Sequence, residues 1–283
     1  MIGLGTWLIP NDDAERVCTD ALNLGYCHID TAQIYQNEEG VGNALVSSSI
    51  PREDIFVTTK MWPGMYGDDT FQTFSGAIEA CEQSLKLLQL NEIDLYLIHN
   101  PFATNSRVEL WEAMIELKKQ GKVKHIGVSN YNVKHIKEIQ DAQLEMPVAN
   151  QIEIHPYHMV PDTLESYMHK HSILPIAYST LAPLPNWREG SRWNSKPEAM
   201  KNDPAIPFLE VAKKYNVTVA QLLLKWSIQL GYPVLPKSVN YERLKENLDL
   251  NFTIAAEDMK HLSVANKAQS LAWQEKFDPL DVD

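Results

Sequence analysis

Four polar or ionisable residues stand at or just after the ends of three consecutive apolar runs. Asp30 closes the first run, Lys60 closes the second, His99 follows the third, and Tyr35 lies five positions after Asp30. A lysine ammonium against a phenol favours the phenolate, so Lys60 should lower the pKa of Tyr35 from about 10 toward working pH. A buried ammonium needs a counter-charge, which Asp30 is placed to supply. These groups suit a general acid that protonates an oxygen, and His99 can orient that oxygen with a hydrogen bond.

Each of the four also has an ordinary structural explanation when it is taken alone. An aspartate at a strand end often caps a turn, and a loop tyrosine often packs against its neighbours. A lysine after a strand is commonly solvated, and a histidine there is commonly a hydrogen-bonded surface residue. The combination at neighbouring strand ends is what favours chemistry over coincidence.

The elements that must position these residues follow from an alternation of apolar runs with segments of helical period. The expected strands are 2–6, 27–31, 55–61, 93–98, 125–129, 148–154, 174–179 and 234–238. The expected helices include 13–24, 39–47, 74–88, 107–119, 133–141, 163–170, 206–230 and 241–248. Strands that alternate with helices in this way predict parallel pairing through crossover helices.

Two α/β architectures fit this pattern, an open doubly wound sheet and a closed eight-stranded barrel. Gly3 and Gly5 could begin a dinucleotide-binding fingerprint, but Leu8 stands where the third glycine belongs. Eight strands within 283 residues favour an (α/β)8 TIM barrel, with residues 1–283 as one domain. In such a barrel the active site lies at the carboxyl ends of the strands, which is where the four residues stand.

Composition narrows the classes of partner. The formal net charge of −12 argues against general affinity for nucleic acid or for an anionic membrane surface. The cysteines Cys18, Cys27 and Cys81 lack the spacing of a zinc site, so we expect reduced thiols and no metal. No apolar run reaches the roughly 18 residues of a membrane span, and no secretory signal opens the chain. We therefore expect a cytoplasmic protein.

A second polar cluster follows the eighth expected strand. Lys237 and Ser238 end that strand, Arg243 comes early in the next helix, and Glu246 and Asn247 follow. The N–H groups at a helix start bind anions, and barrels commonly bind phosphate near strands seven and eight. In an acidic chain, two cations and a hydroxyl at such a place favour a phosphate group over a solvated surface helix.

Three long motifs, in this order, resemble the signatures of the aldo-keto reductase superfamily. They are GYCHIDTAQIYQNEEGVG at 25–42, KHIGVSNY at 124–131 and LPKSVNYERLKENL at 235–248. The resemblance runs over nearly the whole chain. It implies an (α/β)8 barrel that reduces aldehydes or ketones with NADPH, with Asp30, Tyr35, Lys60 and His99 as the catalytic tetrad.

The resemblance also implies the parts of the binding site. Nicotinamide contacts fall on Ser129, Asn130 and Gln151, with Tyr178 as the ring stacked on the nicotinamide. The pyrophosphate loop falls on Ser179 and Leu181, and the adenosine end with its 2′-phosphate falls on Lys237, Ser238, Arg243, Glu246 and Asn247. Trp7 and Trp62, together with His99, resemble the substrate pocket. A monomer is the state usual in the family.

Two departures from the family pattern stand out. The chain begins almost at the first strand, so most of the usual N-terminal β-hairpin is missing. Asn100 follows His99 where an aromatic residue is frequent, which predicts a more polar pocket wall.

Three other functions remain open at this point. A barrel that binds the cofactor without significant turnover could regulate a partner. A metal-dependent barrel hydrolase could use ligands drawn from His28, Asp30, His99, His125, His155 and His158. A double-bond reductase of the same family would carry glutamate at the position of His99, so the histidine argues against it.

Overall fold

The sheet consists of seven parallel strands in sequence order, in a computed structural model that describes residues 1–64, 72–191, 196, 206–266, 270–273 and 278–282. The strands are β1 (Leu4–Gly5), β2 (His28–Asp30), β3 (Phe56–Met61), β4 (Ile93–Ile98), β5 (Val123–Ser129), β6 (Ala149–Glu153) and β7 (Leu174–Tyr178). Each strand pairs with the next one in the chain, which is the order of a barrel and not of a doubly wound sheet.

The barrel closes through a short segment that pairs without forming a regular strand. Val234 forms single parallel bridges to Ile2 on one side and to Ala177 on the other. Gly5 N donates to Pro236 O at 3.0 Å, and Leu235 N donates to Ala177 O at 3.2 Å. The prediction of a strand over 234–238 was therefore wrong in its extent. Pro236 lacks an N–H group and cannot continue the ladder.

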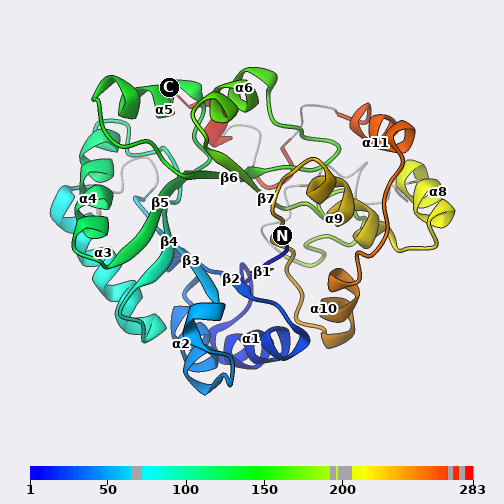
Figure 1. The fold of residues 1–283 in the computed structure, drawn as a ribbon, viewed down its shortest axis with the longest axis horizontal. Coiled ribbons are helices and arrows are strands. Elements are labelled where there is room, and N and C mark those ends of the chain that lie inside the picture. The colour runs from blue at the N-terminus through cyan, green and yellow to red at the C-terminus, as the bar shows by residue number, and fades with distance from the viewer. Residues whose placement is uncertain (65–71, 192–195, 197–205, 267–269, 274–277, 283) are drawn as a thin grey trace.

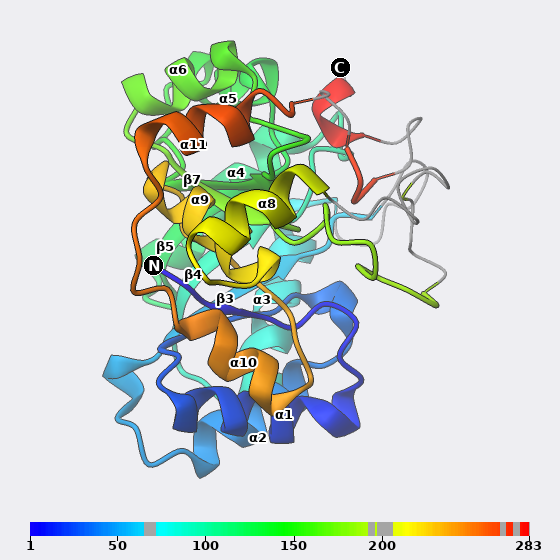
Figure 2. The ribbon, with the colours of Figure 1, turned by 90° about the vertical axis from the view of Figure 1, so that its right-hand side faces the viewer.

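Helices surround this sheet, as Figure 1 shows. Those before β7 are α1 (Asn11–Leu24), α2 (Glu38–Ser47), α3 (Phe74–Leu88), α4 (Arg107–Lys119), α5 (Val133–Asp141) and α6 (Asp162–Lys170). After β7 come α8 (Ile206–Lys214), α9 (Val219–Gln229), α10 (Tyr241–Leu248) and α11 (Ala256–Ser263). Figure 2 shows the chain starting at one end of the barrel and the red C-terminal segment, 278–282, lying at the other.

Two helical regions differ from the sequence-based prediction. The helix expected over 206–230 is two helices, because Asn216 adopts a left-handed φ of 55° and Thr218 starts α9 with a capping box to Gln221. The helix α11 was not predicted; its N-terminal cap, Ala255, forms no side-chain hydrogen bond, so it gave no start signal. No helix in the described ranges is long and apolar enough to cross a membrane.

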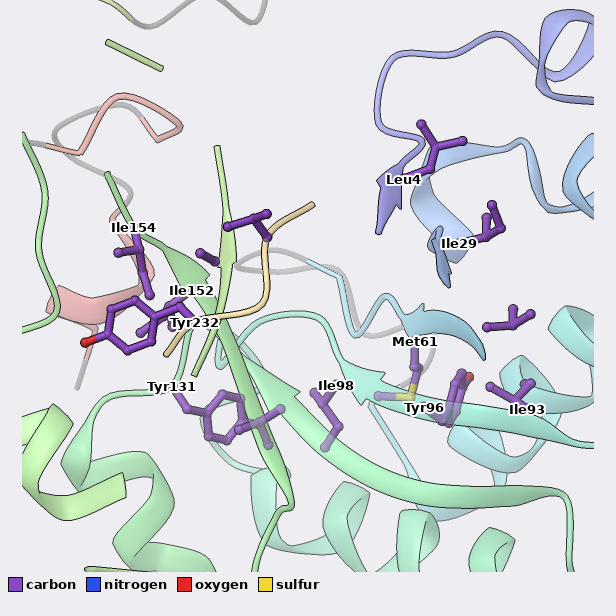
Figure 3. Packing of buried hydrophobic residues seen from close by; sticks show 14 of the residues in the cluster. Leu4, Ile29, Met61, Ile93, Tyr96, Ile98, Tyr131, Ile152, Ile154 and Tyr232 are labelled. Carbon is purple, nitrogen blue, oxygen red and sulfur yellow. The ribbon is translucent and has the colours of Figure 1, made fainter. Parts of the chain in front are cut away.

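Strand register decides which side chains enter the barrel. Successive residues of a strand point to opposite faces, and parallel partners point to the same face. Tyr96 and Ile98 belong to the large cluster between the sheet and the helices, shown in part in Figure 3, whereas Leu95 and Leu97 belong to a separate cluster inside the barrel. Lys60 pairs with Leu97, so its side chain points inward as well.

Candidate active site

The inward register brings Asp30, Lys60 and Tyr35 together at the carboxyl end of the barrel. Asp30 pairs with Thr58, and Thr58 lies two residues before Lys60 on the same face of β3. The Lys60 Nζ donates to Asp30 Oδ1 at 2.6 Å, to the Thr31 carbonyl at 2.8 Å and to the Tyr35 hydroxyl at 3.3 Å. All three ammonium donors therefore have partners, and one of them is the phenol.

The ion pair is almost completely buried, with Lys60 0% and Asp30 3% exposed. Burial alone would lower the pKa of Lys60, but Asp30 and Tyr35 together raise it above its ordinary value, so the ammonium stays charged. The pKa of Tyr35 was expected to fall, and this was wrong as a net direction. Burial of the phenol raises its pKa more than Lys60 lowers it, so Tyr35 stays protonated at neutral pH.

His99 lies beside the phenol as a neutral ring. The centroids of the Tyr35 and His99 rings are 5.6 Å apart, in an edge-on arrangement. Burial, with a smaller contribution from Lys60, holds the pKa of His99 well below its ordinary value. A neutral imidazole can donate one hydrogen bond without placing a second positive charge beside Lys60.

The loop that carries Tyr35 is held by a buried asparagine that the sequence reasoning missed. Tyr35 ends a 3₁₀ helix, Gln33–Tyr35, and Asn37 follows with no exposed surface. The Asn37 amide donates to the carbonyls of Thr6 and Ile9, both at 2.9 Å, and accepts from the Thr31 hydroxyl at 2.7 Å. One side chain thus fixes the loop that contains Trp7 relative to the loop that contains Tyr35.

The predicted nicotinamide residues form a connected hydrogen-bond network. Gln151 Nε2 donates to Asp30 Oδ2 at 2.7 Å, and the Ser129 hydroxyl donates to the Gln151 carbonyl at 2.7 Å. Asn130, in a left-handed conformation, donates to the Ser129 hydroxyl and accepts from the Tyr178 hydroxyl at 2.6 Å. The network links the half-buried ring of Tyr178 to the Lys60–Asp30 pair.

The predicted pyrophosphate residues lie in the turn directly after β7. Ser179 adopts a left-handed φ of 53°, which bends the chain away from the strand. Its carbonyl accepts from Ala182 N at 2.8 Å, and the Leu181 carbonyl accepts from Leu184 N at 3.0 Å. The turn places Ser179 and Leu181 at the same end of the barrel as Tyr178.

The predicted adenosine residues divide into an exposed group and a buried one. Lys237 and Arg243 are exposed and, within the described part of the chain, neither forms an ion pair. Burial of part of Lys237 and the nearby charge of Arg188 lower the pKa of the lysine. Exposed cations that the described part of the chain leaves without an ion-pair partner can bind a phosphate group.

The remaining members of this group have partners within the protein. Ser238 is buried and accepts from Asn240 N at 3.1 Å. Glu246 accepts from the Thr218 hydroxyl at 2.8 Å, and Asn247 is 3% exposed. The cationic part of the prediction is therefore the part that faces solvent.

Aromatic rings lie beside the rings of Tyr35 and His99. Trp7 lies 4.8 Å from the Tyr35 ring and Trp62 lies 5.1 Å from the His99 ring, between centroids. Phe102 is 3% exposed and contacts the ring of Trp273 at 6.1 Å. The wall at Asn100 is not polar as expected, because that side chain is fully buried and its carbonyl accepts from Phe102 N.

Three of the histidines considered as metal ligands have partners within the protein. His28 Nε2 lies 2.9 Å from the Thr58 hydroxyl, His155 pairs with Glu153, and the ring of His158 contacts the Glu153 carbonyl. In the described ranges, no three histidine, cysteine, aspartate or glutamate side chains are placed to hold a metal ion.

Sequence comparison agrees with this geometry. The profile of the aldo/keto reductase family matches residues 1–267. The chain belongs to this family. Glycerol 2-dehydrogenase (NADP(+)) of Saccharomyces cerevisiae is 37% identical over 295 residues, covering 94% of this chain and 87% of the relative. Methylglyoxal reductase DkgA of Escherichia coli is 36% identical over 272 residues, covering 95% of this chain and 90% of the relative.

Solved structures of the family share the fold. An aldo-keto reductase of Bombyx mori in complex with NADP superimposes with a TM-score of 0.82 at 31% identity, covering 95% of this chain and 90% of that chain. A Gox0644 mutant in complex with NADPH superimposes with a TM-score of 0.80 at 37% identity, covering 100% of this chain and 94% of that chain. The barrel of this aldo-keto reductase is thus an (α/β)8 barrel whose eighth position is the bridged segment at Val234.

Proposed function

We propose that this aldo-keto reductase reduces aldehydes and ketones to alcohols with NADPH. The observation that carries the proposal is the buried Lys60 ammonium, which bridges the Asp30 carboxylate and the Tyr35 hydroxyl. Family membership and the NADP-dependent relatives support the same reaction. NADPH, when bound, supplies a hydride to the carbonyl carbon.

The side chains of the tetrad then account for the proton. The Tyr35 hydroxyl donates its proton to the carbonyl oxygen, as a general acid. The Lys60 ammonium stabilises the phenolate that remains, and Asp30 keeps the lysine charged. The neutral His99 ring donates a hydrogen bond to the same oxygen and orients the carbonyl.

Different groups of predicted binding residues would contact different parts of NADPH. Ser129, Asn130 and Gln151 would hold the nicotinamide amide, and the Tyr178 ring would stack on the nicotinamide. Ser179 and Leu181 would contact the pyrophosphate. Lys237, Ser238 and Arg243 would hold the 2′-phosphate, with Glu246 and Asn247 near the adenosine.

We also propose a domain organisation, an oligomeric state and a compartment for the protein. Residues 1–283 form one barrel domain, supported by the hydrogen bonds that join Gly3 and Gly5 to the segment 234–236. A monomer is the proposed state, since one chain supplies all four residues of the tetrad and the reaction needs no second copy. The cytoplasm is its compartment, which the free thiols of Cys18, Cys27 and Cys81 support.

The test is turnover by the isolated protein. NADPH absorbance is followed with methylglyoxal, an aromatic aldehyde, a 2-keto acid, an aldose and a quinone, and the alcohol product is identified. We expect steady NADPH consumption with at least one aldehyde. NADPH binding without consumption across the panel would instead support a barrel that regulates a partner.

A further inference from the structure

Glu153 is a buried carboxylate that the proposed mechanism does not use. It ends β6, two residues after Gln151 and on the same inward face, and it is 3% exposed. A charged carboxylate in such a place must be fully hydrogen-bonded, otherwise its burial would be strongly unfavourable. The hydrogen-bond partners of Glu153 therefore indicate its role in the structure.

These partners lie in the C-terminal tail, more than one hundred positions along the chain. Glu153 Oε1 accepts from Leu271 N at 2.7 Å and from Ala272 N at 3.0 Å, and Oε2 accepts from the Ser270 hydroxyl at 2.7 Å. His155 Nε2 donates to Oε1 at 2.8 Å. Burial alone would raise the pKa of Glu153, but the hydrogen bond and charge of His155, with His158 and the Ser270 hydroxyl, lower it to about 2. We call Glu153 with residues 270–272 the tail clasp.

A second side chain holds the clasp from the other direction. Arg188, in the segment after β7, donates from Nη1 to the Ala272 carbonyl at 3.3 Å. The Ala272 N–H group is bound by a carboxylate and its carbonyl by a guanidinium, so the orientation of this residue is fixed. Farther along, Asn132 Nδ2 donates to the carbonyls of Leu280 and Val282 at 3.0 and 3.1 Å.

The clasp fixes the orientation of the next residue in the chain, Trp273. Its backbone N–H donates to the Ser270 hydroxyl at 3.2 Å, and its indole Nε1 donates to the Tyr178 hydroxyl at 2.7 Å. Tyr178 in turn donates to Asn130, whose amide donates to the His99 carbonyl at 3.0 Å. The clasp is therefore connected to the ring that would stack on the nicotinamide.

We infer that Glu153 is a positioning residue that fixes Trp273 as a wall of the substrate site, and that this wall selects carbonyl compounds with an aromatic group. The inference rests on the proposed function. Trp273 faces Phe102 edge-on, and an aromatic group can contact both rings. A small aldehyde that lies at Tyr35 and His99 has no group to place there, so the clasp matters little for it.

Two variants weaken the clasp to different degrees. Glu153→Leu keeps a side chain of similar volume but removes both accepting oxygens, and Ser270→Ala removes one donor. The matched control is Ser263→Ala, which removes the hydroxyl that accepts from the Trp226 indole at 3.3 Å, outside the active site. Each variant is assayed with benzaldehyde and with methylglyoxal at saturating NADPH.

We expect KM for benzaldehyde to rise about tenfold in Glu153→Leu and two- to threefold in Ser270→Ala, since an aromatic contact contributes up to about 1.5 kcal/mol. The kcat and KM for methylglyoxal should change less than twofold, as should all values in Ser263→Ala. Equal changes for both aldehydes, or no change for either, would overturn the inference.

A second measurement does not depend on turnover. Hydrogen exchange at the Leu271 and Ala272 amides should accelerate about tenfold in Glu153→Leu, which removes the oxygen that accepts from both amides, and stay as in the wild type in Ser263→Ala. Unchanged exchange would overturn the clasp even if the chain proved inactive. Absence of turnover in the wild type would contradict the proposed function alone.

Discussion

The hydroxyl of Tyr35 contacts a lysine ammonium that is held in place by three hydrogen bonds. Lys60 uses all three donors on Asp30, Thr31 and Tyr35, so its ammonium cannot move without losing a buried hydrogen bond. Charges of this kind stabilise a fold weakly because their desolvation offsets their attraction. Their contribution here is geometry: the ammonium remains within 3.3 Å of the oxygen that must carry a negative charge after proton transfer.

Lys237 is the residue with which we test cofactor choice. Lys237→Ala should weaken NADPH binding about ten- to a hundredfold, because a hydrogen bond to a charged group contributes roughly 1.5–3 kcal/mol. NADH lacks the extra phosphate, so its Kd should change less than threefold. Fluorescence titration measures both constants.

The control for this variant is Lys245→Ala, which removes an equal charge from the exposed face of α10. It should leave both constants within a factor of two. Equal weakening of NADPH and NADH by Lys237→Ala would show that this lysine does not recognise the 2′-phosphate.

The positions of single residues could be predicted from sequence where this required only the alternation of side chains along a strand. Asp30, Lys60 and His99 could be placed together because each ends an apolar run in a parallel barrel. The net direction of the Tyr35 pKa could not be predicted in this way. A sequence shows which charge can be a neighbour, whereas the loss of water around a phenol depends on loops packed over it.

At the scale of elements, α2 and α3 approach so closely that only glycine fits between them. A Cβ built on Gly42 would lie 2.4 Å from the Leu87 carbonyl oxygen and 2.8 Å from the Leu88 carbonyl carbon. Glycine inside a helix costs about 1 kcal/mol relative to alanine, so this position is kept for packing and not for helix stability.

Gly42→Ala should therefore destabilise the protein, although alanine is the better helix former. We expect a net loss of about 1–2 kcal/mol in the free energy of unfolding, measured by urea denaturation, because the overlap costs more than the helix gains. Val46→Ala, at a position of the same helix that is 65% exposed, should change it by less than about 0.5 kcal/mol. A more stable Gly42→Ala variant would contradict the packing described here.

Helices and strands with strong periodicity could be predicted nearly to the residue, as α3, α4, α5, α10 and β4 show. The closing segment could not, because its pairing is decided by prolines and by partners at both ends of the chain. Glu153 and Asn37 were missed for a related reason. Asn37 donates to carbonyls 28 and 31 positions away, and Glu153 accepts from a tail that begins 117 positions away. No local pattern records hydrogen bonds of that range.

The stability of the whole molecule depends on pH through buried histidines, because protonation of their rings opposes folding. Burial lowers the pKa of His28 and of His135 to about 4, from an ordinary value of 6.5. His135 also anchors the tail through the Val282 carbonyl, at 2.9 Å from Nε2. In acid the unfolded chain takes up protons near pH 6.5, whereas the native rings resist them until about pH 4.

Stability should therefore be fully present above pH 6.5 and should fall as the pH drops toward 4. Between pH 7 and pH 5 each of the two histidines should remove about 2 kcal/mol from the free energy of unfolding. His135→Gln should reduce this pH dependence by about the share of one histidine, as measured by urea unfolding at several pH values. A free energy of unfolding that is constant between pH 7 and pH 5 would contradict the assignment of neutral, buried rings.

The central claim is that the Tyr35 hydroxyl delivers the proton while NADPH delivers the hydride. Tyr35→Phe removes only that oxygen and keeps the ring beside Trp7 and His99. The most direct measurement compares the rate of aldehyde reduction by this variant and by the wild type, with the Kd for NADPH determined on the same samples. The account predicts a rate at least about a hundredfold lower and a Kd within a factor of two. A variant that reduces the aldehyde within a few-fold of the wild-type rate would contradict it.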